Sequence, residues 1–515
     1  MIAEGVLTAE TLRDMALEWM GKMPGWESIV LLGLLLFLLL IFVAPGRRPP
    51  NFPPGLPMWP VIGSMLHIQG LPLRTVLRNL RKEYGNMASF GVFGTGVLLV
   101  SDFSLIKEIF SHKASRDRPP MSFTTTRNYL LSDGQESNLG IIGGNGDKWQ
   151  ELRRFVLRHL RDFGFGKTTC EPMITKEVTE LMDHIQQQKG QPIPMMRLFN
   201  LSVVNTLWGM VMGKRFAFDD AKVNKLLETF LEPARASNFH PIFFIPGMSK
   251  AVIYLPILRH TTKSLERIVR FVKEEVDNFI SNEDCDVTHS FASIFLKEMQ
   301  RHVGEKSIFN MHEFTAVIFD MFAAGMDTTS STLTMGVYLI AKHPAIQQKV
   351  QQELDEVLGR DRLPSYSDAD ALPYTLATIH EVQRYFCFTA VATHSASEDC
   401  KFAGYDIPKG TVLLENIEAA MTDPKLWKNP QEFDPENFLN ADGKYVKNPA
   451  FIPYGIGTRV CAGEPQARMQ VFLFLSCLFQ RFTFSIVGEE ILFNSPTNFN
   501  APAIYSTVAH PRPPL

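Results

Sequence analysis

One segment of this chain reads Pro453-Tyr454-Gly455-Ile456-Gly457-Thr458-Arg459-Val460-Cys461-Ala462-Gly463-Glu464. It places three glycines around a single cysteine, directly before an apolar stretch that we predict to be helical from about residue 464 to residue 482. The glycines permit sharp turns and let the backbone pass close to a flat object. The amides and the dipole at the start of the coming helix favour a thiolate at Cys461.

A thiolate beside a cation and a smooth glycine surface meets the requirements of an iron porphyrin. In that interpretation the Cys461 sulfur binds the iron and Arg459 pairs with a propionate. The alternative is a glycine-rich turn with an inert cysteine, since most cysteines have structural roles. The segment alone leaves both interpretations open.

Three further motifs carry chemistry earlier in the chain. They are Trp149-Gln150-Glu151-Leu152-Arg153, Ala324-Gly325-Met326-Asp327-Thr328-Thr329 and Glu381-Val382-Gln383-Arg384. On a helix, the four-residue spacing of the first and the three-residue spacing of the last place their end residues on one face. Taken alone, the last motif would more often be a surface ion pair, and the middle one a helix bend with a core threonine.

Together the four motifs resemble those of the cytochromes P450. The cysteine loop follows the family's order of aromatic residue, two positions, glycine, one position, arginine, one position, cysteine, one position, glycine, and Gly457, Arg459, Cys461 and Gly463 lie on it. The resemblance covers essentially the whole chain from Pro49 onward. It is closest to the animal microsomal branch, which oxidises steroids, fatty acids and foreign compounds. It implies the cytochrome P450 fold, mostly α with small β-sheets (α+β), and haem b (iron protoporphyrin IX) as the cofactor.

The resemblance also implies roles for individual residues. The haem contacts, with Cys461 as the iron ligand, are Cys461, Arg459, Gly457, Gly463, Trp149, Arg153, His394, Ala324 and Gly325. Asp327 and Thr328 are the pair that relays protons to dioxygen above the iron. Glu381 and Arg384 form a structural brace that bonds to the loop of residues 434–438.

The chain departs from the family pattern at three of these places. Tyr454 stands where phenylalanine is usual, and its hydroxyl needs a partner if it is buried. Asn437 stands in the brace loop where arginine is frequent, and Thr393 precedes His394 where proline is common.

The resemblance implies substrate contacts at Phe123, at Thr389, Ala390, Val391 and Ala392, and at residues 498–502. The strongly apolar connector of residues 238–246 has two interpretations. It dips into the bilayer and admits lipophilic substrates, or it packs in an ordinary core.

The implied activity is that of a haem-thiolate monooxygenase, which inserts one oxygen atom from O2 into a lipophilic organic substrate. Two alternatives remain, a haem-thiolate isomerase or dehydratase and a non-catalytic haem-binding protein. Retention of Asp327 and Thr328 favours oxygen activation.

The sequence contains no flavin or nicotinamide motif, so the resemblance implies electrons from NADPH through the membrane-bound NADPH–cytochrome P450 reductase. Cytochrome b5 is a second candidate partner. A basic cluster made of Arg154, Arg158, Arg161 and Lys167, together with Arg468, is either a docking face for the acidic reductase or a plain solvated surface.

Residues 29–44 read IVLLGLLLFLLLIFVA and predict a transmembrane anchor. Sixteen residues rise about 24 Å as a helix, so residues 26–28 would complete the span. Arg47 and Arg48 follow the run while the segment before it is acidic, which predicts a lumenal N-terminus and a cytoplasmic body. A cleaved signal peptide is the alternative, but it would require a positively charged start.

We therefore expect a lumenal segment at residues 1–25, the anchor at 26–46, a proline-rich linker at 47–64 and one catalytic haem domain at 65–515. The expected location is the endoplasmic reticulum membrane, with a single pass. A hydrophobic content of 45% is sufficient for a large core, and a net charge of -3 gives no global indication of nucleic-acid binding.

Within the body, the sequence predicts helices at residues 72–82, 311–342 and 376–385. Short strands are predicted at 87–93, 97–100 and 401–408, with Gly94-Thr95-Gly96 as the turn between the first two. The long helix at 311–342 contains Asp320 and Asp327 and has no basic flanks. We therefore interpret it as a buried helix of the body rather than a second membrane span.

Overall fold

The computed structural model describes residues 25–43, 48–60, 62–135, 138–195, 198–217, 259–281, 290–304, 307–488 and 505–513, with positions 220, 223 and 226. Three predicted features lie outside these residues: the lumenal segment 1–25 except for Gly25, the apolar connector 238–246 and the substrate contacts at 498–502. The described chain is mostly helical with small sheets, which confirms the predicted fold class.

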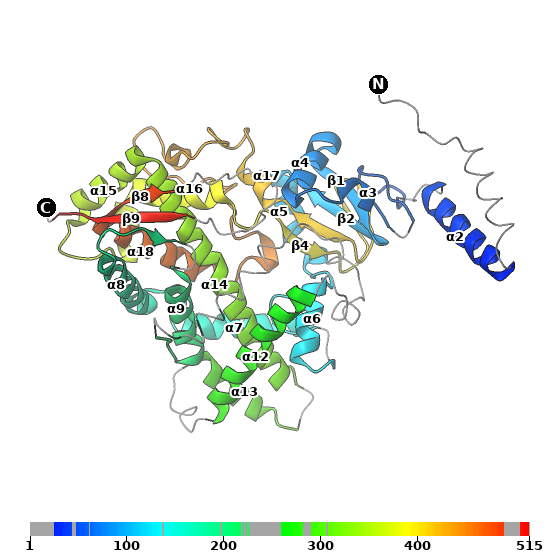
Figure 1. Ribbon diagram of the computed structural model, residues 1–515, viewed down its shortest axis with the longest axis horizontal. Helices are drawn as coiled ribbons and strands as arrows, with labels where there is room; N and C mark the ends of the chain where they lie inside the picture. The colour runs from blue at the N-terminus through cyan, green and yellow to red at the C-terminus, as the bar shows by residue number, and fades with distance from the viewer. Residues whose placement is uncertain are drawn as a thin grey trace.

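The helices with the largest part in the architecture are bounded as follows. They are α2 (Gly25–Val43), α3 (Met65–Ile68), α4 (Leu73–Tyr84), α5 (Phe103–Ser111), α6 (Ser122–Leu131), α7 (Gly146–Asp162), α8 (Glu171–Gln187), α9 (Asn200–Met212), α12 (Arg259–Ser281), α13 (Phe291–Arg301), α14 (Met311–Lys342), α15 (Pro344–Leu358), α16 (Pro373–Phe386), α17 (Ile417–Met421) and α18 (Glu464–Arg481). Figure 1 shows the sheet of β1, β2 and β4 at one end of the body with α3, α4 and α5 beside it, and α8, α9, α15 and α18 toward the other end.

The strands form three small sheets. The strands are β1 (Met87–Val92), β2 (Thr95–Val100), β3 (Ile193–Pro194), β4 (Ala392–Ser395), β5 (Cys400–Phe402), β6 (Tyr405–Ile407), β7 (Val412–Glu415), β8 (Phe482–Val487) and β9 (Ser506–Pro511). The sheet orders are β1-β2-β7-β4, β3-β9-β8 and β5-β6. The predicted turn at Gly94-Thr95-Gly96 was wrong for its last two residues, which belong to β2. Phe93 and Gly94, at φ values of 46° and 79°, make the turn, while Thr95 and Gly96 already pair with β1.

Helix α14 is the central element of the core and has the bounds that the sequence predicts. Its first turn is capped by Asn310, whose side-chain oxygen accepts from the Glu313 amide at 3.0 Å. It ends at His343 because Pro344 follows. Most of its side chains are buried on all sides, against α9, α12, α16 and α18. Such a helix can hold its residues rigidly on the wall of a site.

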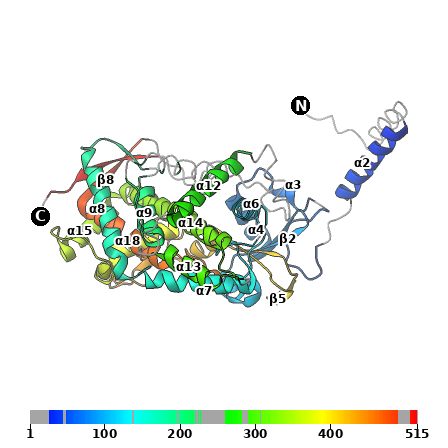
Figure 2. The same cartoon turned by 90° about the horizontal axis from the view of Figure 1, so that it is seen from below.

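Helix α2 stands away from the body, as Figures 1 and 2 both show. Its apolar side chains are exposed from Ile29 to Phe37, and Ile29 reaches 72%. In the part of the chain that the structure describes, no helix combines the length and hydropathy needed to cross a membrane.

Glu381 and Arg384 on α16 form a doubly hydrogen-bonded ion pair. The guanidinium donates to both carboxylate oxygens at 2.7 Å, and both side chains are completely buried. This burial excludes the alternative of a surface ion pair.

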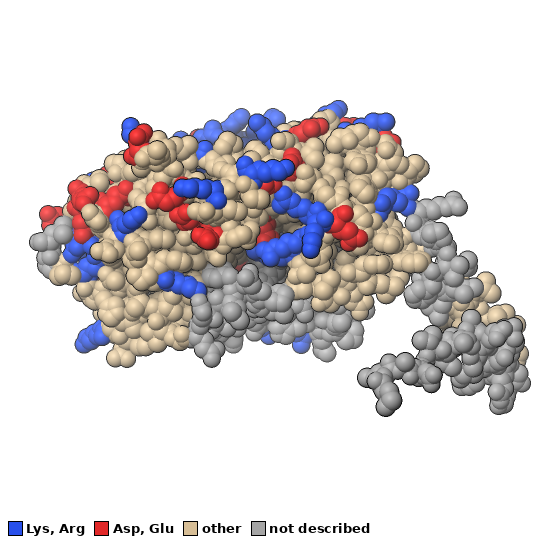
Figure 3. Space-filling model, turned by 90° about the horizontal axis from the view of Figure 1, so that it is seen from above, with Lys and Arg blue, Asp and Glu red and all other residues tan. Residues whose placement is uncertain are grey.

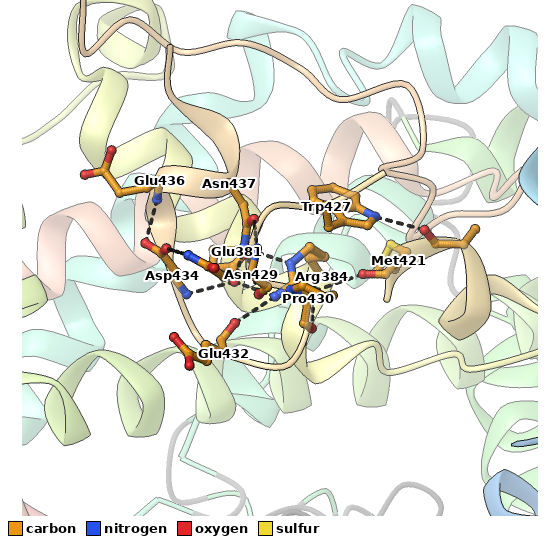
Figure 4. Close-up of polar contacts among 11 residues, drawn as sticks. Glu381, Arg384, Met421, Trp427, Asn429, Pro430, Glu432, Asp434, Glu436 and Asn437 are labelled. Atoms are coloured by element: carbon orange, nitrogen blue, oxygen red, sulfur yellow. Dashed lines mark hydrogen bonds and ion pairs between the residues drawn. The ribbon is translucent and has the colours of Figure 1, made fainter. Parts of the chain in front are cut away.

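The pair also fastens the loop between α17 and the cysteine segment, as Figure 4 shows. Arg384 donates to the carbonyl oxygens of Met421, Pro430 and Glu432 at 2.8–2.9 Å. On the other side, Glu381 accepts from the Asp434 amide at 2.9 Å and from Asn437 at 3.3 Å. Asn437 therefore contributes to the brace despite replacing the usual arginine.

Replacing Arg384 with methionine should destabilise the fold by about 3–5 kcal/mol, because Glu381 is left as a buried, unpaired charge. Urea unfolding followed by circular dichroism measures the change. A matched control is Arg301→Met, which removes the Arg301–Glu298 pair of identical spacing from a side chain that is 75% exposed. That change should cost no more than about 1 kcal/mol. Equal losses in the two variants would contradict the structural role of the brace.

Candidate active site

The cysteine segment forms a tight turn that places Cys461 just before α18. A short 3-10 helix at Gly457–Arg459 leads into it, and the Cys461 amide donates to the Tyr454 carbonyl at 3.0 Å. Gly457 has φ +78°, and a Cβ there would lie 1.9 Å from the Phe110 carbonyl oxygen. Only glycine fits this position, where Gly457 packs against α5. Gly457 is not on the cavity wall, and its predicted haem contact stays a prediction.

Cys461 faces a cavity of about 340 Å³ inside the body. Its side chain is accessible although it lies deep in the protein, because the cavity surrounds it. The wall contains five of the predicted haem contacts besides Cys461: Arg153, Arg459, Gly463, Ala324 and Gly325. Sequence segments more than a hundred residues apart therefore meet around one space.

The protein alone does not favour a thiolate at Cys461. Burial raises the pKa of the thiol, while the amides of Gly463 and Glu464 and the guanidinium of Arg153 lower it. A bound cation would reverse the balance, since a coordinating thiol is deprotonated outright. The site is thus suited to a sulfur that binds metal.

Three guanidinium groups line one side of the cavity: those of Arg118, Arg153 and Arg459. Burial lowers the pKa of all three, and their mutual repulsion adds to this effect at Arg459. The neighbouring carboxylate compensates little, because burial raises the pKa of Glu415 to about 8. This excess of buried positive charge fits a dianionic group such as the two propionates of haem b.

Arg118 was missed by the sequence reasoning. It precedes Pro119 in a loop that belongs to none of the four motifs, and only the fold brings it to the cavity. There its guanidinium donates to the Thr393 carbonyl oxygen.

Trp149 stacks on Arg459, which lines the cavity. The Arg459 guanidinium lies 3.4 Å from the centre of the Trp149 ring. The indole N–H donates to the Ile141 carbonyl at 3.0 Å, and the predicted propionate contact of Trp149 stays a prediction. Arg459 itself donates to the carbonyl oxygens of Arg116 and Gly144 at 2.5 Å. Trp149 therefore positions Arg459 and does not line the cavity.

Arg153 reaches the cavity from α7, as the sequence predicts. Its guanidinium donates to the Val460 carbonyl oxygen, next to the cysteine.

His394 is not among the residues of the cavity wall, and its predicted propionate contact stays a prediction. Its Nδ1 lies 2.9 Å from the Ser115 carbonyl oxygen, and its Nε2 lies 3.5 Å from Glu415 Oε2. The pairing of β4 with β7 turns this side chain inward, and burial lowers the pKa of the imidazole. A neutral His394 helps to hold Glu415, which does line the cavity.

Helix α14 supplies the wall with Ala324, Gly325 and Thr328. The Thr328 hydroxyl donates to the Ala324 carbonyl at 2.9 Å, which leaves its oxygen able to accept from the cavity. Gly325 also serves packing, because a Cβ there would lie 2.4 Å from Leu207 Cδ2 on α9.

Asp327 lies next to Thr328 but is not on the cavity wall. Its Oδ1 accepts from the Ser331 hydroxyl at 3.3 Å. Burial raises the pKa of Asp327 to about 6, although this bond lowers it. The carboxyl group can therefore exchange a proton near neutral pH.

The predicted substrate contacts are only partly on the wall. Thr389 and Ala392 line the cavity, while Ala390 is buried beside α17 and its carbonyl accepts from the Glu418 amide at 3.0 Å. Val391 packs beside the four-stranded sheet, and Phe123 is 46% exposed on α6. Neither lines the cavity. Sequence reasoning missed the aromatic and aliphatic wall residues Phe165, Leu207, Phe386 and Phe388.

Comparison with known proteins agrees with this geometry. The sequence pattern of the family described as Cytochrome P450 matches residues 53–503. Cytochrome P450 2D15 of Canis lupus familiaris is 33% identical over 502 residues, which cover 94% of this chain and 95% of the relative. Cytochrome P450 2J5 of Mus musculus is 33% identical, with 95% and 97% covered, and Cytochrome P450 2D6 of Homo sapiens is 33% identical, with 90% and 94% covered. The chain therefore belongs to the cytochrome P450 family of haem b monooxygenases.

Proposed function

We propose that this monooxygenase takes electrons from NADPH through NADPH–cytochrome P450 reductase and inserts one oxygen atom of O2 into a lipophilic substrate. The observation that supports the proposal is the shared cavity, which is lined both by Cys461 and by Thr328 of α14, a residue able to take part in proton transfer. When bound, haem b supplies thiolate-ligated iron that activates dioxygen. The second oxygen atom leaves as water.

The chain's own residues divide the remaining work. Leu207, Phe386 and Phe388 give the cavity an apolar wall that suits a lipophilic substrate and excludes water. The Thr328 oxygen can accept a hydrogen bond from the cavity. Asp327 stands one residue earlier on α14 with a raised pKa, so it can resupply a proton to Thr328 through water.

Electron delivery needs a surface for the acidic reductase. Arg154, Arg158 and Arg161 are exposed on α7, and their spacing places them on one helix face, with Lys167 exposed shortly after. We propose this cluster as the docking face, with Arg468 beside it and cytochrome b5 as a second partner. Elsewhere the surface charge is mixed: Figure 3 shows acidic and basic side chains interspersed on the upper face, with Lys and Arg gathered beside a hollow.

We further propose that the segment 26–46, which contains most of α2 and continues beyond the described residues, anchors the chain in the endoplasmic reticulum membrane as a single pass. One catalytic domain from residue 65 onward would then lie in the cytoplasm. The support is the exposed apolar surface from Ile29 to Phe37, which would be costly in water. Alkaline carbonate extraction tests this proposal. The full chain should stay in the membrane pellet and a chain lacking residues 1–47 should be released, and release of both would contradict it.

The purified protein, incubated with reductase, NADPH and O2 against a panel of lipids and lipophilic compounds, should form products that carry one added oxygen atom. The yield of product per NADPH should fall on the order of tenfold in Thr328→Val, because the proton relay is lost. The matched control is Thr334→Val, a buried threonine further along α14 that is not on the cavity wall and whose hydroxyl donates to the Ser330 carbonyl at 2.9 Å. It should keep the wild-type yield.

Two outcomes would contradict the proposal. Rearranged products from an organic hydroperoxide, with none from NADPH and reductase, would indicate an isomerase or dehydratase. NADPH consumption that never yields an oxidised compound would indicate a non-catalytic haem protein.

Asp327→Asn should stabilise the protein in a pH-dependent way. The folded-state pKa of Asp327 is raised above the unfolded value, so the unfolded chain loses this proton first. The wild type therefore loses stability as pH rises from about 4 to about 6, while asparagine has no such dependence. The Tm of the variant minus that of the wild type should be larger at about pH 7.5 than at about pH 5. A Tm difference that is independent of pH would contradict the raised pKa of Asp327 in the folded protein.

A further inference from the structure

Gln466, in the first turn of α18, connects a surface loop to the cavity. Its side chain is only 3% exposed. Its oxygen accepts from the Gly166 amide at 3.0 Å and from the Cys170 thiol at 3.2 Å. Since a backbone N–H can only donate, these contacts fix which end of the carboxamide is oxygen.

The nitrogen of the same carboxamide is in a different situation. Gln466 lines the cavity together with Cys461, and its Nε2 is buried without a hydrogen-bond partner among the described residues. Gln470 lies one turn further on the same helix, lines the same cavity and also has an unpartnered Nε2. Buried donors without acceptors are costly, so these groups are arranged for something that occupies the cavity.

The Gln466 carboxamide has little freedom to turn away. Gly166 has φ +70°, and a Cβ there would lie 2.2 Å from Pro465 Cβ. The loop that holds the oxygen is therefore packed directly on the first turn of α18. With its oxygen fixed on one side, the amide presents its N–H groups on the other.

We propose that Gln466 is a positioning residue that directs an N–H, alone or through one water molecule, at the cysteine side of the haem site and thereby makes the iron easier to reduce. A hydrogen-bond donor near the thiolate withdraws negative charge and so favours the more electron-rich ferrous state. The inference rests on the haem site proposed above. It assigns a role to a residue outside all four sequence motifs.

The test is the midpoint potential of the purified, haem-loaded protein, measured by spectroelectrochemistry in two variants and one control. Gln466→Glu keeps an oxygen for Gly166 and Cys170 but exchanges the donor for a carboxylate, whose negative charge lowers the potential further. Gln466→Leu loses the oxygen and the donor without adding charge. Both variants should lower the equilibrium constant for one-electron reduction about fivefold or more, where a tenfold change corresponds to about 59 mV.

The control is Gln480→Leu, a buried residue of the same helix whose amide donates to the carbonyls of Gly359 and Arg362 at 2.8 and 2.9 Å. It should lower the Tm and leave the potential unchanged, because it does not line the cavity. This comparison separates a local electrostatic effect from general loosening of α18.

The proposal would be overturned if the equilibrium constant for one-electron reduction stayed within about twofold of the wild-type value in both Gln466 variants. A shift in Gln466→Leu alone would also overturn it, because the oxygen contact to the loop would then be the active feature. Absence of haem in the wild-type spectrum would instead overturn the haem assignment itself, and that is seen before any variant is compared.

Discussion

The proposed site depends on a thiolate at Cys461, although burial in the protein interior disfavours the charged form of this side chain. Burial raises the pKa of Cys461, and two backbone amides with one arginine only partly offset this. In the proposed site, a bound iron would complete the balance. The surrounding architecture serves to hold the sulfur still: glycine at position 457 allows close packing on α5, and the Tyr454 carbonyl accepts the Cys461 amide.

Charge balance explains the arginines on the cavity wall as well. Arg118, Arg153 and Arg459 bring three guanidinium groups to one wall, where burial lowers the pKa of each. Glu415 is held beside a buried His394, and its pKa of about 8 makes it a weak counter-charge. A buried cluster of like charges is tolerated when an anionic ligand shares the site, and the propionates of haem b provide that charge. The Cys461 sulfur, as a ligand for iron, and the arginines, as partners for the propionates, therefore both fit haem b.

Sequence reasoning was most successful where local rules dominate. The bounds of α14 follow from an asparagine cap and a proline stop, and the cysteine turn follows from its glycines. Side-chain direction was harder to predict. His394 lies on β4, which pairs with β7, and Trp149 stacks on Arg459. Neither side chain is on the cavity wall, and the haem contacts expected of both stay predictions. Arg118 and Gln466 could not be predicted, because only long-range packing brings them to the wall.

The most direct test of the account is the reduced carbon monoxide difference spectrum of the purified protein. The account predicts the band that is diagnostic of thiolate ligation in the wild type, its loss in Cys461→Ala and its retention in Cys477→Ala, which removes a buried thiol from the same helix. A haem-loaded wild type without that band, or a band that survives in Cys461→Ala, would contradict the assignment of Cys461 as the iron ligand.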